Sequence, residues 1–207
     1  MSLPTKLTIL RIVLTPVVVA LLYFETIYFR MASLSVFVIA ALTDWFDGHL
    51  ARKLGYVSPL GNFLDPLADK ILVLSTLFAF AFYGHIAVWM VVVIAARDLI
   101  ITLLRWYADW KRQPVITSAT AKWKTASQMV AVYVIMLCLI IHSYSSDSEP
   151  QSALTWKEWQ GYIDIMMQLV TLITIATAVQ YLIENRHHVR SLMLACLRLF
   201  APGNLAK

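Results

Sequence analysis

Four aspartates stand close together between long apolar runs. They are Asp44, Asp47, Asp65 and Asp69. The chain has only 12 acidic residues among 207, and these four fall within 26 positions. Ionised carboxylates in apolar surroundings are costly, so either their pKa values rise or cations hold the charge. Ligand sets made only of oxygen suit Mg²⁺ or Mn²⁺, and pairs of such ions stabilise displacement at phosphorus. The four residues therefore predict a site for two divalent ions.

Two other roles for these acids stay open on the residues alone. They can form a structural ion-pair cluster, or they can line a cation or proton path in a transporter. Ionisable residues inside a membrane are functional by default, but depth does not fix their role. The acids gather at one side, and the other spans offer no matching acids near the middle, which argues against a transporter.

The composition indicates a membrane protein. The chain is 60% hydrophobic and 14% charged, whereas soluble domains carry about 25% charged residues. Its mean hydropathy is +0.71. The net charge of +5 is typical of basic inner loops and contact with anionic membrane lipid, and we expect no nucleic-acid partner.

Six apolar stretches separated by Gly, Pro, Ser and charged residues are expected to be helical. The sequence thus predicts an all-α, polytopic integral membrane protein with six transmembrane helices. These cover residues 7–28, 31–53, 62–83, 86–109, 122–143 and 160–184. We expect residues 1–185 to form one catalytic domain. A basic amphipathic tail, 186–207, follows, and its part 189–200 is expected to lie on anionic lipid.

The distribution of Lys and Arg predicts the orientation. With the amino terminus inside, only Arg30 and Lys157 fall outside and Arg97 lies mid-helix, which leaves 14 of the 17 basic residues on the inner side. Positive charge is retained on the cytoplasmic side of membranes. We therefore expect both termini in the cytoplasm, with the site facing it, in a bacterial-type inner or plasma membrane.

Helix lengths predict the depth of the aspartates. Met31–Thr43 and Ile71–Tyr83 are uncharged runs of 13 residues, each about 20 Å long at 1.5 Å per residue. The apolar core of a bilayer is about 30 Å thick. Two antiparallel helices of this kind must carry all four carboxylates to one depth near the cytoplasmic face. Spacings of three and four residues keep each pair on one helical face.

The spacing D-x2-D-G-x2-A-R-x8-G-x3-D-x3-D is met at all eight positions. The matching residues are Asp44, Asp47, Gly48, Ala51, Arg52, Gly61, Asp65 and Asp69. In this pattern and in its six-span layout, the chain resembles the CDP-alcohol phosphotransferase family. The resemblance implies transfer of a phosphatidyl group from CDP-diacylglycerol to an alcohol, with release of CMP. It also implies a homodimer with a dinuclear metal site.

The resemblance assigns roles residue by residue. Asp44, Asp47 and Asp65 are expected to be metal ligands, and Asp69 a ligand and the general base. The expected nucleotide-binding residues are Thr8, Gly48, Ala51, Arg52, Ser58 and Gly61. In the implied reaction the acceptor hydroxyl attacks the lipid-linked phosphorus directly.

The acceptor is predicted from basic residues outside the motif. Arg97, Arg105, Lys122 and Lys124 are expected to bind a phosphate monoester. The segments 3–11, 96–105 and 122–129 resemble those of phosphatidylglycerophosphate synthases, whose acceptor is glycerol 3-phosphate. Ser2, Asp98 and Ala121 depart from that pattern, so inositol phosphate, serine and phosphatidylglycerol remain alternative acceptors.

Overall fold

The computed structural model describes residues 3–54, 59–111, 120–148, 156–187 and 189–192. Side chains at 3–7, 44–67, 69, 109–110, 120–124, 145–148 and 156 lie outside the described part. The helices are α1 (Leu3–Leu22), α2 (Ile27–Leu54), α3 (Pro59–Phe82), α4 (Val88–Trp110), α5 (Thr120–Ser148) and α6 (Trp156–Glu184). The all-α prediction is confirmed for the described residues, which contain no strand.

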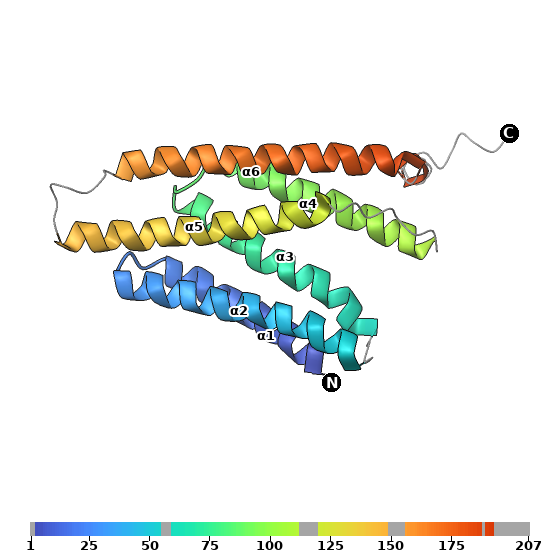
Figure 1. The fold of residues 1–207 in the computed structure, drawn as a ribbon, viewed down its shortest axis with the longest axis horizontal. Coiled ribbons are helices and arrows are strands. Elements are labelled where there is room, and N and C mark those ends of the chain that lie inside the picture. Colours follow the sequence, from blue (N-terminus) through green and yellow to red (C-terminus); the bar gives the residue numbers. More distant parts are fainter. Residues whose placement is uncertain (1–2, 55–58, 112–119, 149–155, 188, 193–207) are drawn as a thin grey trace, which may run out of the picture.

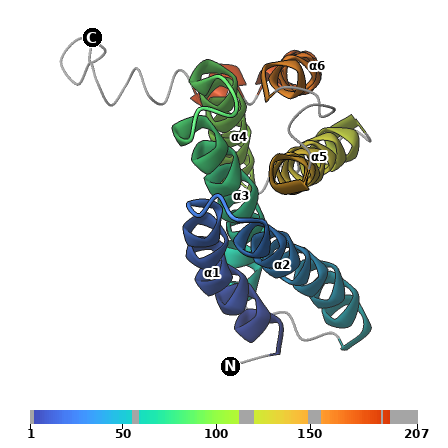
Figure 2. The same ribbon diagram turned by 90° about the vertical axis from the view of Figure 1, so that its left-hand side faces the viewer.

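The helices run alternately in opposite directions along one long bundle (Figure 1). α1, α3 and α5 begin at the end where α2, α4 and α6 finish, and we call it the inner end. α1 packs against α2 and α3, while α3 also contacts α4 and α5. Figure 2 shows α3 between the α1–α2 pair and α4. This places the two helices of the aspartate motif around α1.

The larger of the two apolar core clusters in the described residues has contributions from all six helices. A fully buried member from each helix, in order, is Val18, Phe37, Leu72, Ile94, Ile135 and Met167. Packing of these apolar faces supplies the main stabilisation of the bundle, because helices of this length gain little from propensity alone.

Gly84 follows the last residue of α3 at the end of the bundle opposite the inner end, which we call the outer end. Its φ is +76°, in the left-handed region that glycine adopts without steric cost. The Gly84 N–H donates to Ala81 O at 3.2 Å and the His85 N–H donates to Phe80 O at 2.8 Å, which is the Schellman pattern. Gln160 Nε2 donates to Gly84 O at 3.1 Å, so the start of α6 is fixed to this turn.

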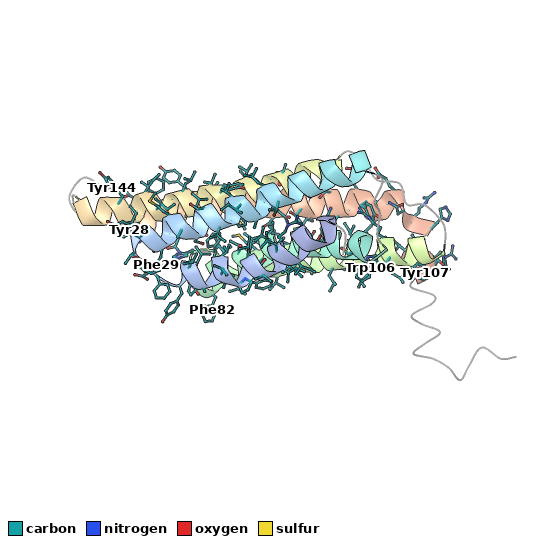
Figure 3. All side chains as sticks on the ribbon, turned by 90° about the horizontal axis from the view of Figure 1, so that it is seen from below. Tyr28, Phe29, Phe82, Trp106, Tyr107 and Tyr144 are labelled. Atoms are coloured by element: carbon teal, nitrogen blue, oxygen red, sulfur yellow. The ribbon has the colours of Figure 1, made fainter. Side chains whose placement is uncertain are left out.

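Two helical stretches are long and apolar enough to cross a membrane, Thr125–Tyr144 and Lys157–Glu184. Shorter apolar stretches occupy parts of α1, α2 and α3. Large aromatic side chains such as Tyr28 and Phe82 lie exposed at the outer end, with Trp106 toward the other end (Figure 3). So much exposed apolar surface is typical of a protein that faces lipid.

The break between α1 and α2 differs from its predicted place. α1 ends at Leu22 and α2 begins at Ile27, so Arg30 lies inside α2. Its buried Nη1 donates to Leu139 O at 2.7 Å and to Ser143 Oγ at 2.5 Å. α2 can start early because α5 supplies acceptors for this charge.

The described start of the tail packs on the bundle. Val189 and Leu192 contact the apolar cluster of Ile101, Leu104 and Tyr181, which joins α4 to α6. These two apolar side chains therefore face protein. Residues 193–207, which include the rest of the stretch predicted to lie on lipid, are outside the described part.

Candidate active site

The backbone places the aspartate motif at the inner ends of α2 and α3. Asp44 lies ten residues before the last residue of α2, and Asp69 lies ten residues after the first residue of α3. Residues 55–58 alone separate the two helices, so both aspartates stand about 15 Å from the connection. Asp47 and Asp65 lie nearer to the connection on the same two helices. Ser58 lies outside the described residues, as do the side chains of every motif residue.

A contact between α1 and α2 sets the level of Asp44. Ser33 Oγ donates to Val18 O at 3.1 Å. On α1, Thr8 lies ten residues inward of Val18. On α2, Thr43 lies ten residues inward of Ser33. Because each residue advances a helix by about 1.5 Å, Thr8 is level with the neighbour of Asp44.

A contact between α1 and α3 sets the level of Asp69. The rings of Tyr23 and Tyr83 lie 6.2 Å apart. Thr8 lies fifteen residues inward of Tyr23. Ala68, which precedes Asp69, lies fifteen residues inward of Tyr83. Two independent contacts thus bring both halves of the motif level with the same residue of α1, in agreement with the depth expected from the sequence.

The α1 residues at this level are buried. Thr8, a predicted nucleotide-binding residue, is 0% exposed, and Arg11, one turn farther out, is 1% exposed. The sequence analysis included Arg11 among the inner-side charges and in the segment 3–11, but gave it no role in the site. A buried guanidinium requires polar or anionic surroundings, and α2 and α3, which pack on α1, carry the motif acids.

Lys70 joins the motif to α4. It follows Asp69 directly, and its Nζ donates to Thr102 Oγ1 and to the Asp98 carbonyl oxygen at 3.5 Å. Thr102 Oγ1 in turn donates to Asp98 O at 2.6 Å. Sequence reasoning missed this contact, although a lysine between the last motif aspartate and an uncharged run was a visible signal.

Arg97 lies in α4 outward of that contact. Its Nη1 pairs with Asp98 Oδ1 at 3.1 Å, and its Nη2 donates to Thr177 Oγ1 of α6 at 3.5 Å. Arg105 is exposed and lies eight residues farther inward, about 12 Å along the helix. The structure therefore does not bring the two predicted phosphate ligands together. Arg105 is the one near the level of the aspartates.

The lysines of α5 lie near the same level. The rings of Phe37 and Tyr133 meet edge to face at 5.3 Å. On α2, Phe46 lies nine residues inward of Phe37 and is the neighbour of Asp47. On α5, Lys124 lies nine residues inward of Tyr133. The side chains of Lys122 and Lys124 are outside the described part, but the backbone of α5 carries both residues to the motif end of the bundle.

The motif aspartates are the remaining metal-binding candidates. Among the described side chains, no group of three His, Cys, Asp or Glu residues is placed to hold a metal ion. The backbone places the four aspartates on two helix ends at one level, and carboxylate oxygens are ligands that suit Mg²⁺ or Mn²⁺.

Comparisons with known proteins give the family of this chain. Three relatives named CDP-diacylglycerol–glycerol-3-phosphate 3-phosphatidyltransferase were compared. The Salmonella choleraesuis protein is 42% identical over 137 residues, which cover 63% of this chain and 74% of the relative. The Pseudomonas fluorescens protein is 39% identical over 142 residues, 66% of this chain and 72% of the relative. An Arabidopsis thaliana form, numbered 2, is 36% identical over 149 residues, 65% of this chain and 64% of the relative, so the match spans just under two thirds of the plant protein.

The family model described as CDP-alcohol phosphatidyltransferase matches residues 1–194, which include all six helices. The chain belongs to the CDP-alcohol phosphatidyltransferase family.

Proposed function

We propose that this protein is a transferase that moves the phosphatidyl group of CDP-diacylglycerol to glycerol 3-phosphate, giving phosphatidylglycerophosphate and CMP. The observation that carries the proposal is the complete eight-position motif on two helix ends that lie level with each other. The acceptor is supported by the relatives, which are named for glycerol 3-phosphate.

Four aspartates are proposed to hold the metal ions. They are Asp44, Asp47, Asp65 and Asp69. The family generally uses divalent metals, and we propose two ions, Mg²⁺ or Mn²⁺. Bound there, such ions would neutralise charge on the diphosphate and ease the loss of CMP.

Asp69 is proposed to act as the general base. Its carboxylate takes the proton of the attacking hydroxyl, the hydroxyl oxygen forms a bond to the lipid-linked phosphorus, and the bond from that phosphorus to CMP breaks. The proposed nucleotide-binding residues are Thr8, Gly48, Ala51, Arg52, Ser58 and Gly61. Arg52 would meet a phosphate, and the small residues leave room for the cytidine.

The phosphate of the acceptor is proposed to bind among the basic residues of α4 and α5. These are Arg97, Arg105, Lys122 and Lys124. The position of α4 and α5 along the bundle favours Arg105 and Lys124 as the phosphate ligands, because these two residues lie near the level of the aspartates. Arg97 already pairs with Asp98 and reaches Thr177, so it would support this region from farther out.

The protein is proposed to be an integral protein of a bacterial-type inner or plasma membrane. Its six helices would span the bilayer, with both termini and the site at the cytoplasmic face. Trp89 and Trp106, both exposed on α4, lie 17 residues apart, about 26 Å, which suits two membrane interfaces. We also propose that the chain forms a homodimer and that anionic lipid contacts its basic inner end.

CMP release by purified protein tests the function. The assay supplies CDP-diacylglycerol with Mg²⁺ or Mn²⁺ and, separately, glycerol 3-phosphate, inositol phosphate, serine or phosphatidylglycerol. We expect release with glycerol 3-phosphate. Release with another acceptor alone would overturn the proposed acceptor, and no release with any acceptor would overturn the proposed transferase.

A further inference from the structure

Gln128 is a buried polar residue of α5 to which the proposed mechanism gives no role. Its side chain is 3% exposed, and its Nε2 is buried without a hydrogen-bond partner in the described part of the chain. Buried amide groups almost always have a partner, because leaving a donor unpaired costs stability. Such a donor is suited to an oxygen that arrives with a bound molecule.

Gln128 lies beside the motif in depth. The rings of Phe37 on α2 and Tyr133 on α5 are in contact. Leu42 lies five residues inward of Phe37, and Gln128 lies five residues inward of Tyr133. Leu42 is two residues from Asp44, so Gln128 stands about 3 Å outward of that aspartate in level.

The side chain of Gln128 is on the face of α5 that packs into the bundle. Ala131, Val132 and Ile135 continue this face at intervals of three, four and seven residues, and all three are buried in the common core. α5 packs against α6 and also against α2 and α3, the two helices of the motif. The amide therefore lies inside the bundle at the depth of the proposed site.

Lys124 lies one turn inward of Gln128 on the same face. One turn is about 5.4 Å, which is comparable to the distance from the ester oxygen to the terminal hydroxyl oxygen across the three carbons of an extended glycerol phosphate. An acceptor whose phosphate lies near Lys124 would extend its carbon chain toward Gln128 and toward the level of Asp44 and Asp69. A neutral amide donor at that place is suited to a hydroxyl group.

We infer that Gln128 determines specificity for the acceptor by donating a hydrogen bond from Nε2 to the secondary hydroxyl of glycerol 3-phosphate. The inference rests on the proposed function and adds the group that distinguishes this acceptor from other phosphate monoesters. Sites that hydrogen-bond a substrate hydroxyl discriminate strongly against analogues without it, because their own buried group is then left unpaired.

The test compares two acceptors in the wild type and in Gln128→Met. One acceptor is glycerol 3-phosphate, and the other is 3-hydroxypropyl phosphate, which lacks only the secondary hydroxyl. The wild type should prefer glycerol 3-phosphate by about tenfold or more in kcat/KM. In Gln128→Met this preference should fall to within about twofold, through loss of activity on glycerol 3-phosphate and an unchanged KM for CDP-diacylglycerol.

Thermal unfolding of the same variant separates this role from a structural one. Methionine has a similar length and removes an unpaired amide, so the Tm without acceptor should stay the same or rise. Gln168→Met is the matched control, because Gln168 is exposed on α6 and the same change there should alter neither acceptor preference nor Tm.

Each other outcome overturns the inference. An unchanged preference shows that Gln128 does not contact the hydroxyl. Equal losses on both acceptors indicate contact with the phosphate, a raised KM for CDP-diacylglycerol indicates contact with the nucleotide lipid, and a lowered Tm indicates a structural role. If the wild type itself releases no CMP with glycerol 3-phosphate, the proposed function fails, and this inference fails with it.

Discussion

Two basic side chains inside the bundle lie against polar partners. Arg97 pairs with Asp98, and Lys70 donates to Thr102. Partners offset the high cost of removing these groups from water. Ionised carboxylates in apolar surroundings likewise need cations to offset their charge, which is the physical basis for proposing metal ions at the four aspartates of the motif.

The base and the metal ligands can be separated by substitution. Asp69→Asn should lower CMP release by about 10²- to 10⁴-fold, because the acceptor hydroxyl loses its proton acceptor. It should retain more Mn²⁺ binding than Asp44→Asn, since Asp44 is proposed to act only as a ligand. Calorimetric titration with Mn²⁺ measures the binding. Equal loss of binding in both variants would contradict the role of Asp69 as base.

His85 predicts a pH dependence of stability at the outer end. Burial, with a further contribution from the charge of Arg30, lowers the pKa of His85 from 6.5 to about 4, while Glu25 opposes the shift and His142 adds to it. Between about pH 6.5 and 4 the unfolded chain binds a proton that the folded chain does not, so stability falls as the pH falls through this window. Above pH 6.5 the two states bind equally.

Thermal unfolding in detergent checks this expectation. The Tm should be lower at pH 5 than at pH 7.5, and the difference should shrink in His85→Gln, which cannot take up the proton. An undiminished difference in the variant would assign the pH dependence to other groups.

At the scale of elements, polar contacts join pairs of helices at two levels. Near the outer end, Arg30 of α2 holds the carbonyl of Leu139 in α5. Near the motif, Lys70 of α3 holds Thr102 of α4. Apolar contacts are not directional, whereas a hydrogen bond joins two particular atoms. These two contacts therefore help to fix the axial position of α2 relative to α5 and of α3 relative to α4.

The contact between α3 and α4 should influence turnover. Lys70→Met should lower kcat/KM by about tenfold and Thr102→Val by about threefold, because both remove the same hydrogen bond beside Asp69. The double variant should be no worse than Lys70→Met alone, since residues in contact are not additive. Thr76→Val is the control, because its buried hydroxyl donates to Leu72 O of its own helix and, among the described residues, to no neighbouring helix. Losses that multiply in the double variant would show that the two residues act separately.

The whole molecule is a long bundle with an apolar exterior and its motif at one end. Turn residues such as Glu25 and the exposed start of α6 lie at the end away from the motif. If the bundle spans a membrane, these two places face one side and the proposed site faces the other.

Cysteine labelling tests that orientation. In a background with Cys138 and Cys196 replaced by alanine, single cysteines replace Glu25, Lys157 or Arg186, all exposed. A membrane-impermeant thiol reagent should label the first two in intact cells and should label the third only after the membrane is opened, because Arg186 lies at the inner end. Labelling of the Arg186→Cys protein in intact cells would reverse the orientation.

The sequence alone was sufficient for the number and order of the helices and for the family to which the motif belongs. Apolar runs between Gly, Pro and charged residues predicted six helices, because these signals are local, but the break between the first two helices was predicted too late: α1 ends at Leu22 and α2 begins at Ile27. The spacing of the aspartates predicted two helical faces, and the length of the flanking runs predicted a common depth. The number of membrane spans and the roles of the motif residues stay predictions.

Only the tertiary structure decided which residues lie level with one another. It placed Arg30 within α2 against α5, joined Lys70 to α4, separated Arg97 from Arg105, and brought Gln128 beside the level of Asp44. Helical periodicity assigns a residue to a face of its own helix. Register between helices depends on how side chains from distant segments pack, and no local pattern in the sequence contains that information.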